Sequence, residues 1–200
     1  MNAYRVHDLL QIDPAVAGQW SDAPSWVGCA LERAPWVVVR RTVAPNGIAV
    51  GVRGSGRGRR YAAVIAPQDV RDVRVPEDLI ARADGAGRLG WAFGACSTGA
   101  RAHGLTVAPI GAYGFALASG SPATHARSDL DLLLRAETFA LESLRAFAAA
   151  CASVTSRLGV AIDVELAFGA NGLALAEVLA GGAAVVAKTP HGPKFVACLK

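Results

Sequence analysis

The sequence predicts an α+β fold, with a small N-terminal antiparallel β-rich domain at residues 1–80 and a mixed α/β domain at residues 81–200. Two observations predict this class. The first half contains short β-type runs separated by turn residues, and the second half alternates helical and strand patterns. With 200 residues, of which 52% are hydrophobic, the chain is long enough to bury a sizeable core.

Three runs in the first half have the composition of strands. They are WVVVRR, IAVGVR and YAAVIA, at residues 36–41, 48–53 and 61–66. Turn residues lie between them, at Pro45–Gly47 and Gly54–Gly56, so we expect hairpins that build an antiparallel sheet. Pro76, followed by Glu77 and Asp78, is typical of a helix start, because proline suits the first turn and acids favour the helix N-terminus.

The second half alternates between the two kinds of element. We expect helices at residues 88–103, from about 113, at 137–157 and near 173–179. We expect strands at residues 106–111, 129–135, 160–168, 184–188 and 195–199. This order predicts a mixed sheet covered by helices.

Composition argues against several classes of protein. The longest uncharged stretch, residues 105–126, is interrupted by glycine and proline and is unsuited to a membrane-spanning helix. Residues 1–14 lack the apolar core of a secretory signal, so we expect a cytoplasmic protein with no membrane partner. The cysteines, at positions 29, 96, 151 and 198, lack the close pairing of a zinc motif, and we expect small buried side chains.

The positive charge is concentrated in the first half. The net charge is only +4, but arginines occupy positions 40, 41, 53, 57, 59 and 60. Guanidinium groups bind phosphate oxygens in a bidentate manner, so this cluster suits a polyphosphate or an acidic protein. Few aromatic residues are interleaved, and we therefore expect no nucleic-acid partner. The same arginines also fit a solvated loop with strand edges.

The segment SDLDLLL, at residues 128–134, contains the most informative carboxylates. On a strand, Asp129 and Asp131 point to one face, while Leu130 and Leu132 point into the core. Two carboxylates on one face repel each other, a cost that a bound cation offsets. Mg²⁺ commonly combines one or two carboxylates with substrate phosphates, so the pair is a candidate Mg²⁺ site. A lone D-x-D pair is common, and by itself it also fits a strand without chemistry.

Two further segments favour phosphoryl transfer. Asp163 and Glu165 repeat the strand spacing, and one of them completes a two-metal site if the two strands are neighbours. The spacing does not choose between them. Upstream, Gly111 and Ala112 lie in a turn between a strand and a helix, where backbone amides can approach a phosphate.

This pattern resembles the nucleotidyltransferase superfamily, whose signature is a strand, a Gly-Gly or Gly-Ser turn, a helix and D-h-D on the next strand. The chain more closely resembles the malonate decarboxylase holo-acyl-carrier-protein synthases, also called phosphoribosyl-dephospho-CoA transferases. The segments that carry this resemblance span nearly the whole chain: HDLL at 7–10, WVVVRR at 36–41, GVRG at 51–54, RYAA at 60–63, PEDL at 76–79, residues 111–120 with 128–133, DVEL at 163–166 and VAKT at 186–189.

The resemblance implies a nucleotidyltransferase-like catalytic domain, a Mg²⁺ cofactor and a specific reaction. The 5-phosphoribosyl-dephospho-CoA group of triphosphoribosyl-dephospho-CoA is transferred to a serine of the malonate decarboxylase acyl-carrier protein, with release of diphosphate. An acyl-carrier protein is usually acidic, so a basic face on this chain would steer it.

For this chemistry we expect Asp129 and Asp131 to hold Mg²⁺, and Asp163 or Glu165 to complete the metal site or take the serine proton. The flanking Ile162 and Val164 slightly favour Asp163. The candidates for binding phosphate or substrate are Gly111, Ala112, Ser128, Lys188, Arg53 and Arg60. A solvent-directed strand-end lysine explains Lys188 as well. His7 and Asp8 match the family without a role that we can derive, and Asp8 also suits a helix cap.

The chain departs from the family pattern at Ala112, where the phosphate turn of the family carries serine. We expect weakened rather than abolished function, because the backbone amides remain. Three alternatives stay open: another nucleotidyltransferase with a different acceptor, the related modification of citrate lyase, and a catalytically decayed module that binds a carrier protein.

Overall fold

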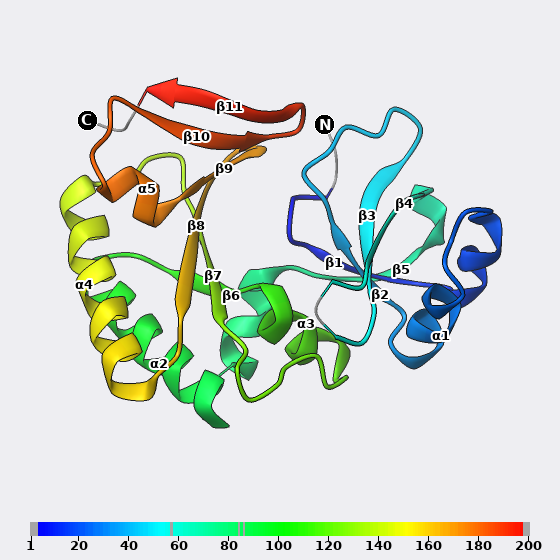
Figure 1. Ribbon diagram of the computed structural model, residues 1–200, viewed down its shortest axis with the longest axis horizontal. Helices are drawn as coiled ribbons and strands as arrows, with labels where there is room; N and C mark the ends of the chain where they lie inside the picture. Colours follow the sequence, from blue (N-terminus) through cyan, green and yellow to red (C-terminus); the bar gives the residue numbers. More distant parts are fainter. Residues whose placement is uncertain (1–3, 57, 84, 86, 198–200) are drawn as a thin grey trace.

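The computed structural model describes residues 4–56, 58–83, 85 and 87–197, which form two sheets with their helices (Figure 1). The first sheet has five strands in the order β4-β3-β2-β1-β5, and every described pairing in it is antiparallel. The second has six strands in the order β11-β10-β9-β8-β7-β6. The predicted α+β class, with an antiparallel sheet preceding a mixed one, is confirmed.

The first sheet contains the three strands that the sequence predicts and two that it does not. Its strands are β1 (Leu9–Ile12), β2 (Trp36–Val39), β3 (Ile48–Arg53), β4 (Arg60–Ile65) and β5 (Val70–Arg74). The two unpredicted strands, β1 and β5, have only four and five residues, and three of the five in β5 are charged. They become strands because β1 pairs with β2 on one side and with β5 on the other.

The two faces of the first sheet pack against different partners. One face is covered by the 3-10 helix η1 (Pro14–Gln19) and α1 (Trp26–Arg33), whose Val27 and Leu31 are fully buried four residues apart. On the other face, Leu9 and Trp36 join Phe115 in a separate apolar cluster. This second cluster connects the first sheet to the second half of the chain.

The second sheet combines one parallel pair with antiparallel neighbours. Its strands are β6 (Val107–Pro109), β7 (Leu130–Arg135), β8 (Ile162–Phe168), β9 (Asn171–Ala174), β10 (Ala184–Thr189) and β11 (Gly192–Ala197). The parallel strands β7 and β8 are joined by α4 (Leu141–Leu158), as a parallel pair requires a crossover connection. The remaining helices are α2 (Gly87–Ala102), α3 (Gly111–Ser119) and α5 (Leu175–Leu179).

The alternation of β7 separates the core from the site. Leu130, Leu132 and Leu134 are buried in a cluster with residues of α2 and α4. The intervening Asp131 and Leu133 point to the opposite face. In Figure 1, α2 and α4 lie on one side of β7 and β8, and the first sheet lies on the other. The strand pattern therefore directs Asp131 towards the first sheet.

Several predicted elements differ from the observed ones. The helix expected at Pro76 is the 3-10 helix η3 (Pro76–Arg82). The helix expected from residue 137 begins at Leu141, after Ala140 in an extended backbone conformation, and the preceding Phe139 makes an edge-to-face contact with Phe168, 5.0 Å between ring centroids. The helix expected near residues 173–179 begins at Leu175, because Leu173 and Ala174 belong to β9.

The cysteine expectation holds only in part. Cys96 and Cys151 are buried, with their sulfurs 3.9 Å apart, and Cys198 lies outside the described residues. Cys29 is exposed, because it lies midway between the two buried positions of α1 and faces away from the core. Among the described residues, no helix is both long and apolar enough to cross a bilayer.

Candidate active site

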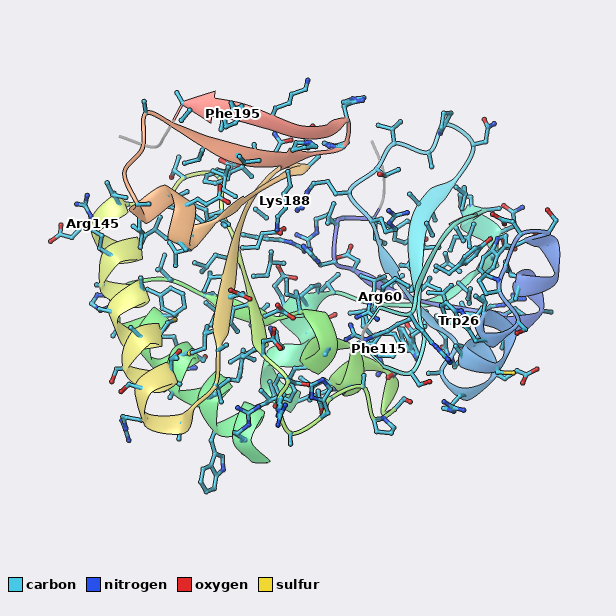
Figure 2. The ribbon with its side chains drawn as sticks, in the orientation of Figure 1. Trp26, Arg60, Phe115, Arg145, Lys188 and Phe195 are labelled. Atoms are coloured by element: carbon cyan, nitrogen blue, oxygen red, sulfur yellow. The ribbon has the colours of Figure 1, made fainter. Side chains whose placement is uncertain are left out.

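A cavity of about 1190 Å³ opens between the two sheets and continues past β8 to α4 and α5. Its charged lining comes from both of them: His7, Arg40, Arg53 and Arg60 from the first half, and Asp131, Asp163, Glu165 and Lys188 from the second. Figure 2 shows Arg60 and Phe115 in the space between the sheets. The cavity thus brings together residues that are far apart in the sequence.

Two of the predicted carboxylates are strand neighbours. Asp131 on β7 lies directly opposite Asp163 on β8 in the parallel register, so both point to the cavity. Asp129 lies one residue before the start of β7. Burial raises the pKa of Asp131, and the negative charges of Asp163 and Asp129 raise it further, against the opposing effect of Arg53 and His7. A bound cation would therefore stabilise the charged form of the Asp131 carboxylate.

The backbone turn at Gly111 fits against this carboxylate. A Cβ atom on Gly111 would lie 1.8 Å from Asp131 Oδ2, and the φ of Gly111 is +62°, so a side chain is excluded on two grounds. The adjacent Ile110 N–H donates to the Asp131 carbonyl at 3.0 Å. These contacts place the N-terminal end of α3 beside Asp131.

Arg53 and Arg60 face the carboxylates from the first sheet. They are directly opposite each other on β3 and β4, and the Arg53 guanidinium lies 5.9 Å from the centroid of the Phe115 ring. Burial and the charge of Arg60 lower the pKa of Arg53 to about 10, although Asp131 acts in the other direction. Burial also lowers the pKa of Arg60. Two crowded guanidinium groups form a site that an anion would stabilise.

A second cavity of about 440 Å³ shares lining residues with the larger one. It is lined by Arg53, Arg60 and Asp131, which also line the larger cavity, and in addition by Ala112, Ser128 and Asp129. The Ser128 Oγ accepts a hydrogen bond from the His125 N–H at 2.9 Å, so this hydroxyl holds the loop that precedes Asp129. Ala112 and Asp129 therefore share one cavity with the two arginines.

Glu165 has a different environment from Asp131. Its Oε1 accepts from His7 Nε2 at 2.8 Å and from Arg41 Nη2 at 2.5 Å, and its Oε2 accepts from Lys188 Nζ at 3.0 Å. Burial alone would raise the pKa of Glu165, but the hydrogen bonds from His7, Arg41 and Lys188 outweigh it and hold that pKa far below its usual range. This carboxylate is already compensated by protein cations.

The expected roles of Glu165 and Lys188 change accordingly. Glu165, a candidate catalytic carboxylate, is bound to three basic side chains, and Lys188, a candidate phosphate ligand, is one of them. Of the two acidic residues on β8 that the sequence left open, Asp163 is the one in register with Asp131. The geometry therefore favours Asp163 as the third carboxylate.

The sequence indicated several of the residues that join the two sheets, but not the contacts that they make. His7 has a φ of +73° and is the one residue other than glycine in the left-handed region within the described parts of the chain. The buried Asp8 accepts from Arg5 N–H at 2.8 Å and from Arg135 Nη2 at 3.2 Å, at the end of β7. The HDLL segment and the Arg40–Arg41 pair contain these residues, but neither motif indicates which side chain of the second sheet each residue contacts.

The carboxylates of the cavity suit a Mg²⁺ ion that substrate phosphates also bind. Within residues 4–56, 58–83, 85 and 87–197, no three His, Cys, Asp or Glu side chains converge closely enough to hold a metal by themselves. A Mg²⁺ site built from one or two carboxylates and completed by substrate phosphates does not require three. Asp131 and Asp163, in register and electrostatically coupled, fit that kind of site.

Comparison with known proteins identifies the family. Residues 5–76 match the N-terminal domain, and residues 79–198 the C-terminal domain, of phosphoribosyl-dephospho-CoA transferase MdcG. A phosphoribosyl-dephospho-CoA transferase of Pseudomonas putida is 36% identical over 197 residues, which cover 98% of this chain and 95% of that protein. The protein of the same name from Klebsiella pneumoniae (strain 342) is 36% identical over 202 residues, covering 96% of this chain and 94% of its own length.

Solved structures provide no comparable match. The family models and the relatives confirm the resemblance that the sequence motifs indicate, over both halves of the chain. The chain belongs to the MdcG family of phosphoribosyl-dephospho-CoA transferases.

Proposed function

We propose that this protein transfers the 5-phosphoribosyl-dephospho-CoA group from triphosphoribosyl-dephospho-CoA to a serine of the malonate decarboxylase acyl-carrier protein. The observation that carries the proposal is that Asp131, its strand neighbour Asp163 and the Arg53–Arg60 pair line one cavity, to which both family domains contribute. The serine oxygen forms a bond to the phosphorus nearest the ribose, the bond from that phosphorus to the bridging oxygen breaks, and diphosphate leaves.

We assign Mg²⁺ binding to Asp129 and Asp131, with Asp163 as the third carboxylate. When bound, Mg²⁺ would neutralise charge on the phosphate oxygens during a nucleotidyltransferase-type displacement. The proposal is supported by the raised pKa of Asp131, which results from burial and from its acidic neighbours. Asp163 is exposed, so in the alternative role, as a base rather than a metal ligand, it could accept the serine proton through water.

We assign the leaving diphosphate to the smaller cavity. Arg53 and Arg60 present guanidinium groups there, and Ala112 brings the N-terminal end of α3 to the same lining. A diphosphate needs several donors and positive charge, and this cavity combines both. The larger cavity then receives the remainder of the donor, and the displacement takes place where the two cavities share Asp131.

The test is to incubate the purified protein with Mg²⁺, the triphosphoribosyl donor and the apo acyl-carrier protein, and to measure the intact mass of the carrier. A mass gain equal to one phosphoribosyl-dephospho-CoA group, absent in Asp131→Ala and Asp129→Ala, is the expected result. A folded wild-type protein that binds Mg²⁺ but produces no mass gain would move the assignment to another acceptor. Absence of both transfer and Mg²⁺ binding would identify a decayed site.

A further inference from the structure

One arm of the larger cavity lies on the opposite face of β8 from the Asp163 side chain, between α4 and α5. This α4–α5 arm is lined by Ala148, Ala152 and Ser156 of α4, Ile162 and Val164 of β8, and Ala176 of α5. These side chains are uncharged, whereas Arg53, Arg60 and Lys188 line the other end of the cavity. Arg145 lies on the outer side of α4 in Figure 2 and does not belong to the lining. The cavity therefore has a charged end and a neutral arm.

The strand β8 presents an open edge to this arm. β9 pairs with β8 only from Glu165 to Phe168, so within the described residues the segment 162–164 has a strand neighbour only in β7. Leu130 N–H donates to the Ala161 carbonyl at 2.8 Å, which fixes the side on which each backbone group of β8 lies. By alternation, the N–H and C=O groups of Ile162 and Val164 point away from β7 and towards the α4–α5 arm.

We infer that the α4–α5 arm binds the pantetheine arm of the dephospho-CoA donor, an inference that rests on the proposed function for the identity of that donor. Pantetheine is extended and uncharged, and it carries two secondary amides. A free strand edge binds extended chains through the same amide donors and acceptors. The phosphates of the donor then lie among the arginines, so the distribution of charge along the cavity follows the distribution of charge along the donor.

The adenine base of the donor fits this arm less well. Bases bind mainly by stacking on aromatic rings or guanidinium planes. Tyr61 of β4 and Phe115 of α3, which line the cavity, come from its charged end, where Phe115 contacts Arg53. Among the described residues, no ring lines the part between α4 and α5. The open edge and aliphatic wall therefore favour the amide-bearing arm.

The inference is tested by binding rather than by turnover. Isothermal titration would compare dephospho-CoA with ADP-ribose, a diphosphate diester of equal charge that has a sugar in place of pantetheine. We expect dephospho-CoA to bind about tenfold to a hundredfold more tightly to the wild-type protein, the factor that one or two added hydrogen bonds and some apolar contact supply. Ala152→Trp, which fills the arm from an exposed position, should abolish this preference.

Two further variants make the outcome decisive. Ala149→Trp places the same ring at an exposed position of the same helix outside the cavity lining, and it should retain the preference. Ala176→Trp blocks the arm from α5 and replaces Ala152→Trp if that variant does not fold. Equal wild-type affinities for the two ligands, or a preference that survives both blocking variants, would overturn the inference and leave the arm to another occupant, such as an extended carrier segment. A preference located in the arm without any transfer to the carrier would instead reject the proposed function alone.

Discussion

Asp131 and Glu165 lie on neighbouring parallel strands and face the same cavity, yet their environments are opposite. Asp131 is crowded by Asp163 and Asp129, and its pKa is raised by burial and by those charges. Glu165 is surrounded by His7, Arg41 and Lys188, and its pKa is lowered. The difference shows that two carboxylates on neighbouring strands can have opposite electrostatic environments: the surroundings of Asp131 disfavour its charge, and those of Glu165 compensate its charge with protein cations.

The strongest way to test this contrast is to neutralise Asp131. Asp131→Asn should lower transfer to the carrier by about 10³-fold, the order of effect of removing one electrostatic stabiliser from a transition state. The free energy of unfolding should not fall, because the substitution removes a charge that its surroundings disfavour. Intact-mass kinetics and urea unfolding measure the two quantities. A large loss of stability would show that Asp131 is structurally compensated as Glu165 is.

The converse is expected for Glu165. Glu165→Gln should lower the free energy of unfolding by about 2–4 kcal/mol, because the change leaves buried cations without their anion. Arg41 loses the most, since its side chain is only 10% exposed. The matched control is Lys188→Met, which removes a 57% exposed partner and should cost far less. Equal losses of unfolding free energy for Glu165→Gln and Lys188→Met would contradict the assignment of Glu165 as the anion shared by His7, Arg41 and Lys188.

The pH dependence of stability sharpens the same comparison. The folded-state pKa of Glu165 is depressed, so its stabilisation is complete above its ordinary pKa of 4.5 and is lost as the pH falls from there towards the folded value. The pKa of Asp131 is raised, so its unfavourable charge is relieved as the pH falls. Between pH 7 and pH 3, Glu165→Gln should therefore lose less stability than the wild type, and Asp131→Asn should lose more. Urea unfolding at several pH values distinguishes these slopes.

The surroundings of Asp131 could be predicted in part from the sequence, but those of Glu165 could not. Strand periodicity places Asp131 and Asp163 on one face, and the parallel register then pairs them. The partners of Glu165 come from the first sheet, where His7 and Arg41 lie 158 and 124 residues away in the chain. No local pattern encodes a contact between domains at that separation.

The same reasoning applies to the fold. The predicted strands of the first sheet, β2, β3 and β4, contain apolar runs flanked by turns and are recognisable locally. The missed strands β1 and β5 exist because β1 pairs with a strand on each side, and this information is not local. The open half of β8 likewise depends on where β9 ends, which single-strand patterns do not reveal.

A substitution at Gly111 would test whether the close approach of the backbone to the Asp131 carboxylate matters for activity. Gly111→Ala introduces a Cβ that would overlap the Asp131 carboxylate, at a position with a φ of +62°. Gly120→Ala is the matched control at the other end of α3, with a φ of +69° and nothing within 4 Å of the added atom. Both should lose about 1–2 kcal/mol of stability from backbone strain. Only Gly111→Ala should also lower kcat, about tenfold or more, because it displaces Asp131. Equal kcat values would remove Gly111 from the site.

The smallest expected effect lies at Ala112, where the family pattern has serine. Ala112→Ser places a hydroxyl in the smaller cavity beside Arg53 and Arg60, where it can donate to a diphosphate oxygen. One added hydrogen bond is worth about 0.5–1.5 kcal/mol, so kcat/KM should rise about twofold to tenfold. Ala116→Ser, one turn later on α3 and outside both cavity linings, controls for serine in the helix and should leave kcat/KM unchanged. An unchanged value for Ala112→Ser would mean that the backbone amides and the arginines already satisfy the leaving group, and that the departure from the family pattern costs this protein nothing.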